Sequence, residues 1–169
     1  MPGSLGHLAA RFFDYLTAGE LSAAEERLVR DWLSSKEIDL FFAQSKRDRA
    51  HGFHAAMFVA EADHPSPELV QAALLHDVGK RHSDLGVVGR VVASLLIKAG
   101  LPLTERMARY RDHGLLGARD LEHSGSSRLA IDFARHHHGQ RPGTIDLETW
   151  DLLQRADIPA KPRLGGGRE

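Results

Sequence analysis

The sequence predicts an all-α fold, and three observations lead to this prediction. Most segments carry apolar residues at the spacing of one helix face, Gly and Pro separate these segments, and no segment alternates apolar and polar residues as a half-buried strand does. The chain has 169 residues, of which 42% are hydrophobic, so it is long and apolar enough to bury a sizeable core as one domain.

Residues 1–42 predict a short helical N-terminal cap. Residues 5–18 have the periodicity of an amphipathic helix. Ser22 and Glu25 have the spacing of a capping box, which marks the start of a second helix. A short apolar segment, residues 38–42, leads into the next helix. We therefore expect residues 1–42 to pack as a cap on the rest of the chain.

Residues 43–160 predict the main helical bundle. Its expected helices are residues 45–62, 67–77, 87–99, a segment that contains His113, 129–137 and 146–157. Residues 87–99 are rich in β-branched side chains, which leaves a strand conceivable, but their length and spacing favour a helix. Residues 161–169 contain three consecutive glycines, and we expect them to form a flexible tail.

The composition excludes several classes of function. The formal net charge is −1, so no overall field attracts the chain to nucleic acid or to anionic lipid. The absence of cysteine excludes disulfides, thiolate metal ligands and cysteine nucleophiles. No basic segment precedes an apolar stretch, and no apolar run is long enough to cross a bilayer. We therefore expect a cytoplasmic protein that binds neither a membrane nor a nucleic-acid polymer.

The most informative feature is the pair His76 and Asp77, which follows the apolar residues 72–75. An unpaired imidazole or carboxylate against a hydrophobic core is costly, and a divalent cation that binds both side chains would offset this cost. The alternative is an ordinary helix C-terminus, with Gly79 just after the helix and both polar side chains in water. The pair by itself leaves both interpretations open.

The rest of the chain favours the metal interpretation. Further histidines and an aspartate occur in or beside segments with helical periodicity. In chain order the candidates are His51, His76, Asp77, His113, His136, His137, His138 and Asp157. Imidazole nitrogen and carboxylate oxygen together suit Fe, Mn, Zn, Co or Ni.

In this order the residues resemble the HD-domain superfamily of metal-dependent phosphohydrolases. The resembling segments are residues 49–56, 72–80, 113–118, 135–138 and 155–157. The most specific part is the sequence Ala-Leu-Leu-His-Asp-Val-Gly-Lys, and the similarity covers residues 45–160 as a whole. The resemblance implies that residues 43–160 form an HD-domain helical bundle.

The resemblance also implies a metal site and a reaction. The positions that match the family's metal ligands are His51, His76, Asp77 and Asp157. A metal-bound hydroxide would then hydrolyse a phosphomonoester or phosphodiester, and nucleotides are candidate substrates. Lys80 would place its ammonium group beside the phosphoryl group, so the expected catalytic residues are Asp77 and Lys80.

Two further histidines suggest a second ion. Related families use a histidine before a Gly-Ala pair and a His-His pair for this purpose, and His113 and His137 match those positions. The cyclic-dinucleotide phosphodiesterases of the HD-GYP type share these histidines. Residues 139–143 lack their acidic residue and their Gly-Tyr-Pro motif, which speaks against cyclic-di-GMP as the substrate. His138 fits either a further ligand or a phosphate contact.

The remaining candidates have weaker support. His54 lies one turn after His51 and is expected either to pack near the site or to touch it. Asp48 lies one turn before His51 and is expected either to orient its ring or to be a solvated charge. The candidates for contacts to phosphate or to a nucleobase are Arg81, Arg90, Arg135 and Arg141, with a solvated surface charge as the alternative for each.

Three classes of function fit these residues. The first is a metal-dependent phosphohydrolase that holds one or two divalent ions and acts on a small-molecule phosphoester. The second is a di-iron oxygenase, because the same ligands suit iron and a few relatives activate dioxygen. The third is a non-catalytic regulatory module that keeps the metal. A homo-oligomer is compatible with each of them.

Overall fold

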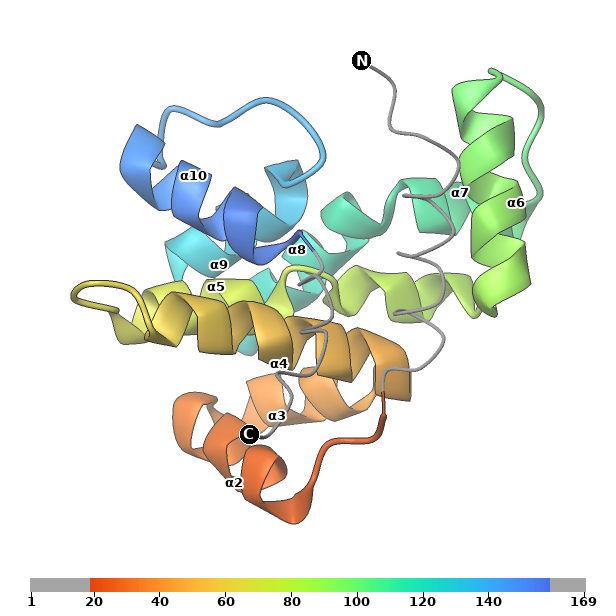
Figure 1. Ribbon diagram of the computed structural model, residues 1–169. Helices are drawn as coiled ribbons and strands as arrows, with labels where there is room; N and C mark the ends of the chain where they lie inside the picture. Colours follow the sequence, from red (N-terminus) through yellow and green to blue (C-terminus); the bar gives the residue numbers. More distant parts are fainter. Residues whose placement is uncertain (1–18, 159–169) are drawn as a thin grey trace, which may run out of the picture.

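The computed structural model of the chain describes residues 19–158, which form nine α-helices, one 3-10 helix and no strand (Figure 1). The predicted all-α class is confirmed. The helices are α2 (Ala23–Trp32), α3 (Ser35–Phe42), α4 (Lys46–Ala60), α5 (Pro67–Leu75), the 3-10 helix η1 (Val78–Ser83), α6 (Val87–Lys98), α7 (Glu105–Arg111), α8 (His113–Ser124), α9 (Arg128–His136) and α10 (Leu147–Ala156).

Local sequence signals account for most of these helices. The backbone N–H of Ser22 donates to Glu25 Oε2 at 2.7 Å and that of Glu25 to Ser22 Oγ at 3.3 Å, so the predicted capping box is present. The single helix expected around His113 is two helices, α7 and α8, which meet at Asp112. The helix expected at residues 5–18 and the tail at 161–169 lie outside the described residues.

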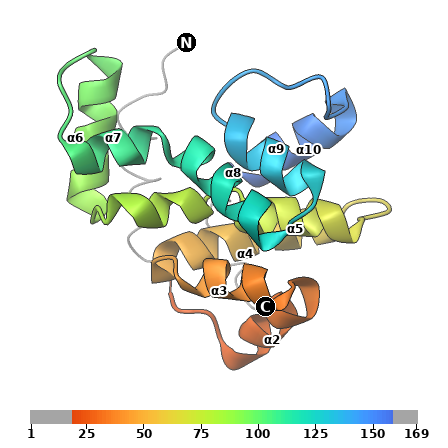
Figure 2. The same ribbon diagram turned by 180° about the vertical axis from the view of Figure 1, so that it is seen from behind.

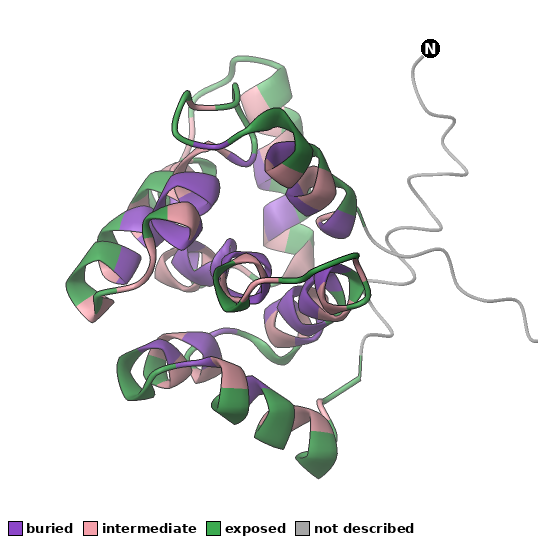
Figure 3. Cartoon of the chain, turned by 90° about the vertical axis from the view of Figure 1, so that its left-hand side faces the viewer, coloured by how far each residue is buried: buried purple, intermediate pink, exposed green. Residues whose placement is uncertain are grey.

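Helix α5 lies at the centre of the bundle. It packs against α4 and α9, and α10 contacts both α4 and α5. Helix α8 packs on α9 and on η1. The buried faces of these helices point toward one another (Figure 3). The largest buried apolar side chains include Phe41, Val59, Leu74, Leu75, Leu121, Phe133 and Leu153.

Helices α2 and α3 lie on the opposite side of α4 and α5 from α10 (Figures 1 and 2). Both contact α5, and α3 also contacts α8. Val29 and Phe41 are fully buried in the same core as the other helices. That residues 1–42 form a cap packed on the bundle stays a prediction. Among residues 19–158, no helix has the length and apolar character needed to span a membrane.

Candidate metal centre

Four side chains from three parts of the chain form a first group: His51 in α4, His76 and Asp77 after α5, and Asp157 after α10. One ligand atom from each lies within 4.8 Å of those of the others. Asp157 Oδ1 is 2.9 Å from His51 Nε2 and 3.1 Å from His76 Nε2. Asp77 Oδ2 is 3.4 Å from His76 Nε2 and 3.8 Å from His51 Nε2. The four positions that match the family's ligands are therefore brought together.

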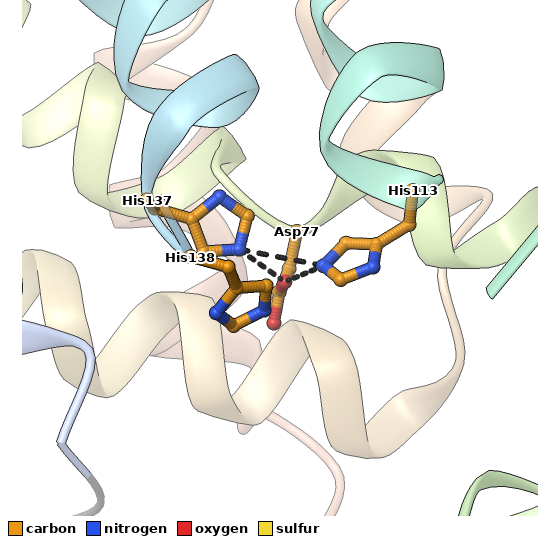
Figure 4. A group of neighbouring side chains, drawn as sticks. All are labelled: Asp77, His113, His137 and His138. Carbon is orange, nitrogen blue, oxygen red and sulfur yellow. Dashed lines mark hydrogen bonds and ion pairs between the residues drawn. The ribbon is translucent and has the colours of Figure 1, made fainter. Parts of the chain in front are cut away.

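A second group lies on the other side of Asp77. His113 from the start of α8 and His137 and His138 from the end of α9 point toward this carboxylate (Figure 4). Asp77 Oδ1 is 3.4 Å from His113 Nε2 and 3.5 Å from His137 Nε2. The two oxygens of Asp77 thus face different groups: Oδ2 faces the first and Oδ1 the second.

Three glycines let the helices that carry these side chains approach one another. A Cβ at Gly52, the residue after His51, would lie 2.6 Å from a backbone oxygen of α5. One at Gly79 would lie 1.9 Å from the carbonyl oxygen of His113, and one at Gly114 would lie 2.8 Å from a backbone oxygen of α9. Real Cβ atoms do not approach so closely, so each contact requires glycine.

The rings of His76, His113 and His137 are oriented in the same way. In each, Nδ1 lies near the carbonyl oxygen of the residue three positions earlier, at 2.8, 2.6 and 2.8 Å respectively. A carbonyl oxygen only accepts hydrogen bonds, so Nδ1 carries the proton and donates it. In the neutral ring the lone pair is then on Nε2, which faces Asp77. This orientation prepares Nε2 for a metal ion.

Asp77 Oδ1 is buried and makes no hydrogen bond. Its neighbours His113 Nε2 and His137 Nε2 lie 3.4 Å from each other. In neutral rings these two nitrogens are acceptors, so three acceptors face one another without a donor. A buried polar atom left in this state costs about 1–3 kcal/mol. A divalent cation among the three atoms would satisfy all of them, so the residues present fit a metal ion.

The two carboxylates of the first group also suit a cation. Burial would raise the pKa of Asp77, but Lys80 and His76 hold it well below its ordinary value. Burial would likewise raise the pKa of Asp157, but His76 and a hydrogen bond from His51 lower it. Burial lowers the pKa of His76, yet the two carboxylates outweigh this effect and raise it to about 10. Without a cation the ring therefore also carries a proton on Nε2, which a bound metal ion would displace. Ionised carboxylates are the form that binds a metal.

Two histidines of the second group, His137 and His138, are held in their neutral form. Burial lowers the pKa of His137. Partial burial and the neighbouring His137 and His113 lower the pKa of His138 to about 3, although part of this side chain is exposed. Neutral imidazole is the form that donates to a metal. His138 thus has the protonation state of a ligand, at the solvent-facing edge of the group.

Two further residues complete the surroundings of Asp77. The Lys80 ammonium donates to Asp77 Oδ2. Burial would lower the pKa of Lys80, but Asp77 and Asp48 raise it above its ordinary value. The ring of Tyr110 stacks on that of His113, with 5.7 Å between ring centroids. The backbone carbonyl oxygen of Tyr110 accepts a hydrogen bond from His113 Nδ1. Sequence reasoning missed Tyr110, whose only signal is its position three residues before a candidate ligand.

An open pocket of about 960 Å³ adjoins both groups. His137 and His138 line it on one side and Asp157 on another, and the rest of its wall comes from α10 and the residues beside it. The other lining residues are Leu147, Glu148, Asp151, Gln154, Arg155 and Ile158. The pocket therefore gives a small molecule access to the histidines and to Asp157.

Several weaker candidates lie outside both groups. His54 is exposed on α4, on the side of the helix that faces Glu25 of α2. Arg81 pairs with a carboxylate of α8 at 2.8 Å. Arg141 donates to the backbone oxygen of Ile145. The structure thus engages these three side chains elsewhere, and a role for them in the site stays a prediction.

Both expectations for Asp48 from the sequence are wrong. It neither orients His51 nor faces solvent, because its side chain is 2% exposed and Arg90 donates to both carboxylate oxygens, at 2.6 and 2.7 Å. The expectation of a phosphate contact or a solvated charge is therefore also wrong for Arg90. Arg135 pairs with Glu122 at 2.6 Å. The Asp48 pair ties α6 to the first turn of α4, close to His51.

The chain is an all-helical bundle in which histidines and aspartates from distant segments converge into groups that could hold a metal ion. Comparison with known families is specific: the family model described as the HD domain matches residues 50–164. The chain belongs to the HD domain family. Neither a curated protein nor a solved structure matches the chain.

Proposed function

We propose that the chain is a metal-dependent phosphohydrolase that cleaves a phosphomonoester or phosphodiester, with nucleotide-like compounds among its candidate substrates. The observation that carries the proposal is the position of Asp77, whose two oxygens face two different groups of imidazoles. Enzymes with two divalent ions use such a pair to stabilise both the attacking and the leaving oxygen of a phosphoester. A carboxylate that faces two groups of ligands could be a ligand of both ions.

The ligands divide between the two groups. We assign His51, His76 and Asp157 to the first ion, His113 and His137 to the second, and Asp77 to both, with His138 as a further candidate ligand. All are nitrogen or oxygen donors, which suit Fe, Mn, Zn, Co or Ni. When bound, such ions lower the pKa of water and polarise a phosphoryl oxygen. The three Nδ1–H donors keep the rings fixed in the orientation that this binding needs.

Lys80 is the second catalytic residue in this proposal. Its ammonium lies against Asp77 Oδ2 and its side chain is 15% exposed, so a positive charge is fixed beside the carboxylate that faces both groups. A phosphoryl oxygen is a strong acceptor for such a donor. The guanidinium groups of Arg81 and Arg135 pair with Asp120 and Glu122, which belong to neither ligand group. The carboxylate beside Lys80 is Asp77, which faces both groups, so Lys80 is the better supported phosphate contact.

The pocket supports a substrate larger than phosphate itself. Its volume of about 960 Å³ is at the upper end of ordinary ligand pockets. Leu147 and Ile158 are exposed and supply apolar surface, while Glu148 and Asp151 supply acceptors for hydroxyl or amino groups. A leaving group with both an apolar face and hydrogen-bond donors, such as a nucleoside, fits these side chains.

Metal analysis followed by an activity screen tests the proposal. The purified protein is loaded with Mn, Fe, Zn, Co or Ni and assayed with p-nitrophenyl phosphate, bis-p-nitrophenyl phosphate, nucleoside monophosphates and cyclic nucleotides. We expect metal-dependent release of phosphate or nucleotide under anaerobic conditions, and its loss in Asp77→Asn. Consumption of dioxygen by a di-iron form would favour the oxygenase instead. Bound metal without turnover on any phosphoester would favour a regulatory module.

A further inference from the structure

Helix α6 exposes a continuous apolar stripe. Val88 and Leu95 are 73% and 63% exposed, and Val91 and Val92 between them are also exposed. Their spacing places all four on one face of the helix, since residues three and four apart are neighbours on a helix surface. A contiguous apolar patch of this kind on a surface helix indicates an interaction site.

The position of α6 leaves this stripe without a partner among residues 19–158. The helix lies at the periphery of the bundle (Figures 1 and 2). Of its residues only Arg90 and Ala93 are buried, and its main contact is with α7. Because Arg90 holds α6 to Asp48 of α4, the stripe is presented on an anchored helix.

The stripe is complementary to itself. In an antiparallel pair of α6 helices centred between Val91 and Val92, each Val91 faces Val92 of the second copy. Val88 then faces Leu95 of the second copy at both ends of the contact. Each large side chain thus meets another apolar side chain, as a two-fold symmetric interface requires.

The ends of the stripe add charge complementarity. Lys98 is exposed and lies three positions after Leu95, on the same face. In the antiparallel pair it lies beside the start of α6 of the second copy, and Asp84, three residues before that helix, has a side chain that is 94% exposed. Within its own chain Asp84 pairs with the exposed Arg106, a contact of the weak surface kind. A parallel pair would place the two Lys98 side chains together, which disfavours it.

We propose that α6 is the interface of a homodimer in which the stripes of two copies pack antiparallel about a two-fold axis between Val91 and Val92. A single helix of 12 residues on each side buries less surface than a permanent dimer does. The proposed dimer is therefore a reversible one in equilibrium with the monomer. This inference is independent of the metal centre and of the proposed reaction.

Single cysteines test the arrangement, because the chain contains none of its own. Val91→Cys should give a disulfide-linked dimer on mild oxidation, since residue 91 lies next to the axis. Val88→Cys should give no disulfide-linked dimer, because the two copies of residue 88 lie about 10 Å apart along the helices of the proposed pair. Phe58→Cys, exposed on α4, is the control. Equal cross-linking of all three variants would overturn the proposal.

Sedimentation equilibrium tests the dimer without cross-linking. Leu95→Lys should raise the dissociation constant at least tenfold, while Phe58→Lys should leave it unchanged. A monomer at every concentration would overturn the proposal, and so would a dimer that Leu95→Lys does not weaken. In such a monomer, a Val91→Cys thiol that did not react with a thiol reagent would be covered. The stripe would then be packed against another part of the same chain.

Discussion

The backbone of Gly79 lies directly against the carbonyl oxygen of His113. A Cβ on residue 79 would be 1.9 Å from that oxygen. Gly117, one turn further along α8, packs against the same glycine from its own side. This backbone contact joins η1 to the start of α8, so that Asp77 and His113 can face each other across 3.4 Å.

Gly79→Ala should push η1 away from α8. We expect a loss of stability of at least about 1–3 kcal/mol, as for other overpacked positions, together with a loss of bound metal. Urea unfolding and elemental analysis measure the two effects. Gly86→Ala is the matched control, because nothing lies within 4 Å of a Cβ at that glycine. Equal stability of the two variants would show that the close contact is unimportant.

His113→Ala should lose one metal ion per chain and keep the other. The reason is that His113 belongs to the second group, while the four ligands of the first group remain. Elemental analysis of the loaded protein gives the count. His123→Ala, an exposed histidine on the same helix, should keep both ions. Loss of both ions in His113→Ala, or of none, would contradict the division into two groups.

Lys80→Ala should keep the metal and lose turnover. Lys80 contacts Asp77 but is not a ligand, and removal of one positively charged donor to a phosphoryl group costs roughly 100-fold or more in kcat. Steady-state kinetics and elemental analysis are compared on the same preparation. Metal loss equal to that of Asp77→Ala would assign Lys80 a structural role instead.

Asp48→Asn should destabilise the protein. The change leaves the buried Arg90 without its ionised partner, and breaking one partner of a buried pair costs about 3–5 kcal/mol. Lys46→Gln breaks the exposed pair with Glu20 and should cost less than about 1 kcal/mol. Thermal unfolding measures both. An equally small loss of stability in both variants would mean that the pair of Asp48 and Arg90 contributes little to the free energy of unfolding.

The same pair predicts a pH dependence. Burial would raise the pKa of Asp48, but Arg90 lowers it below its usual 3.8. A carboxylate with a lowered folded-state pKa contributes stability above its unfolded value, and this contribution is lost as the pH falls toward the folded value. Wild-type protein should therefore lose stability below about pH 4 more steeply than Asp48→Asn does. The free energy of unfolding is measured against pH for both proteins. Equal slopes below about pH 4 would refute this prediction.

The helices and the ligands could be predicted for different reasons. Helical class follows from local periodicity and from capping residues such as Ser22, which act within a few positions of the chain. The ligand set came from the resemblance, because no spacing rule places Asp157 beside His51 across 106 residues. That the two oxygens of Asp77 face different groups of ligands follows only from the tertiary structure.

The remaining features depend on tertiary contacts. Asp48 and Arg90 are 42 residues apart, and neither has a local signal for a buried pair. The break between α7 and α8 falls beside His113, whose ring is held by the carbonyl of Tyr110. Backbone carbonyls carry no sequence signature, so the orientation of the three rings could not be read from residue types alone.

The most direct test of the account is an anomalous difference map from crystals of the protein loaded with Mn or Fe. Two peaks are expected, one beside each oxygen of Asp77. The first should be contacted by His51, His76 and Asp157, and the second by His113 and His137. A map with no peak at Asp77, or with its peaks away from these side chains, would contradict it.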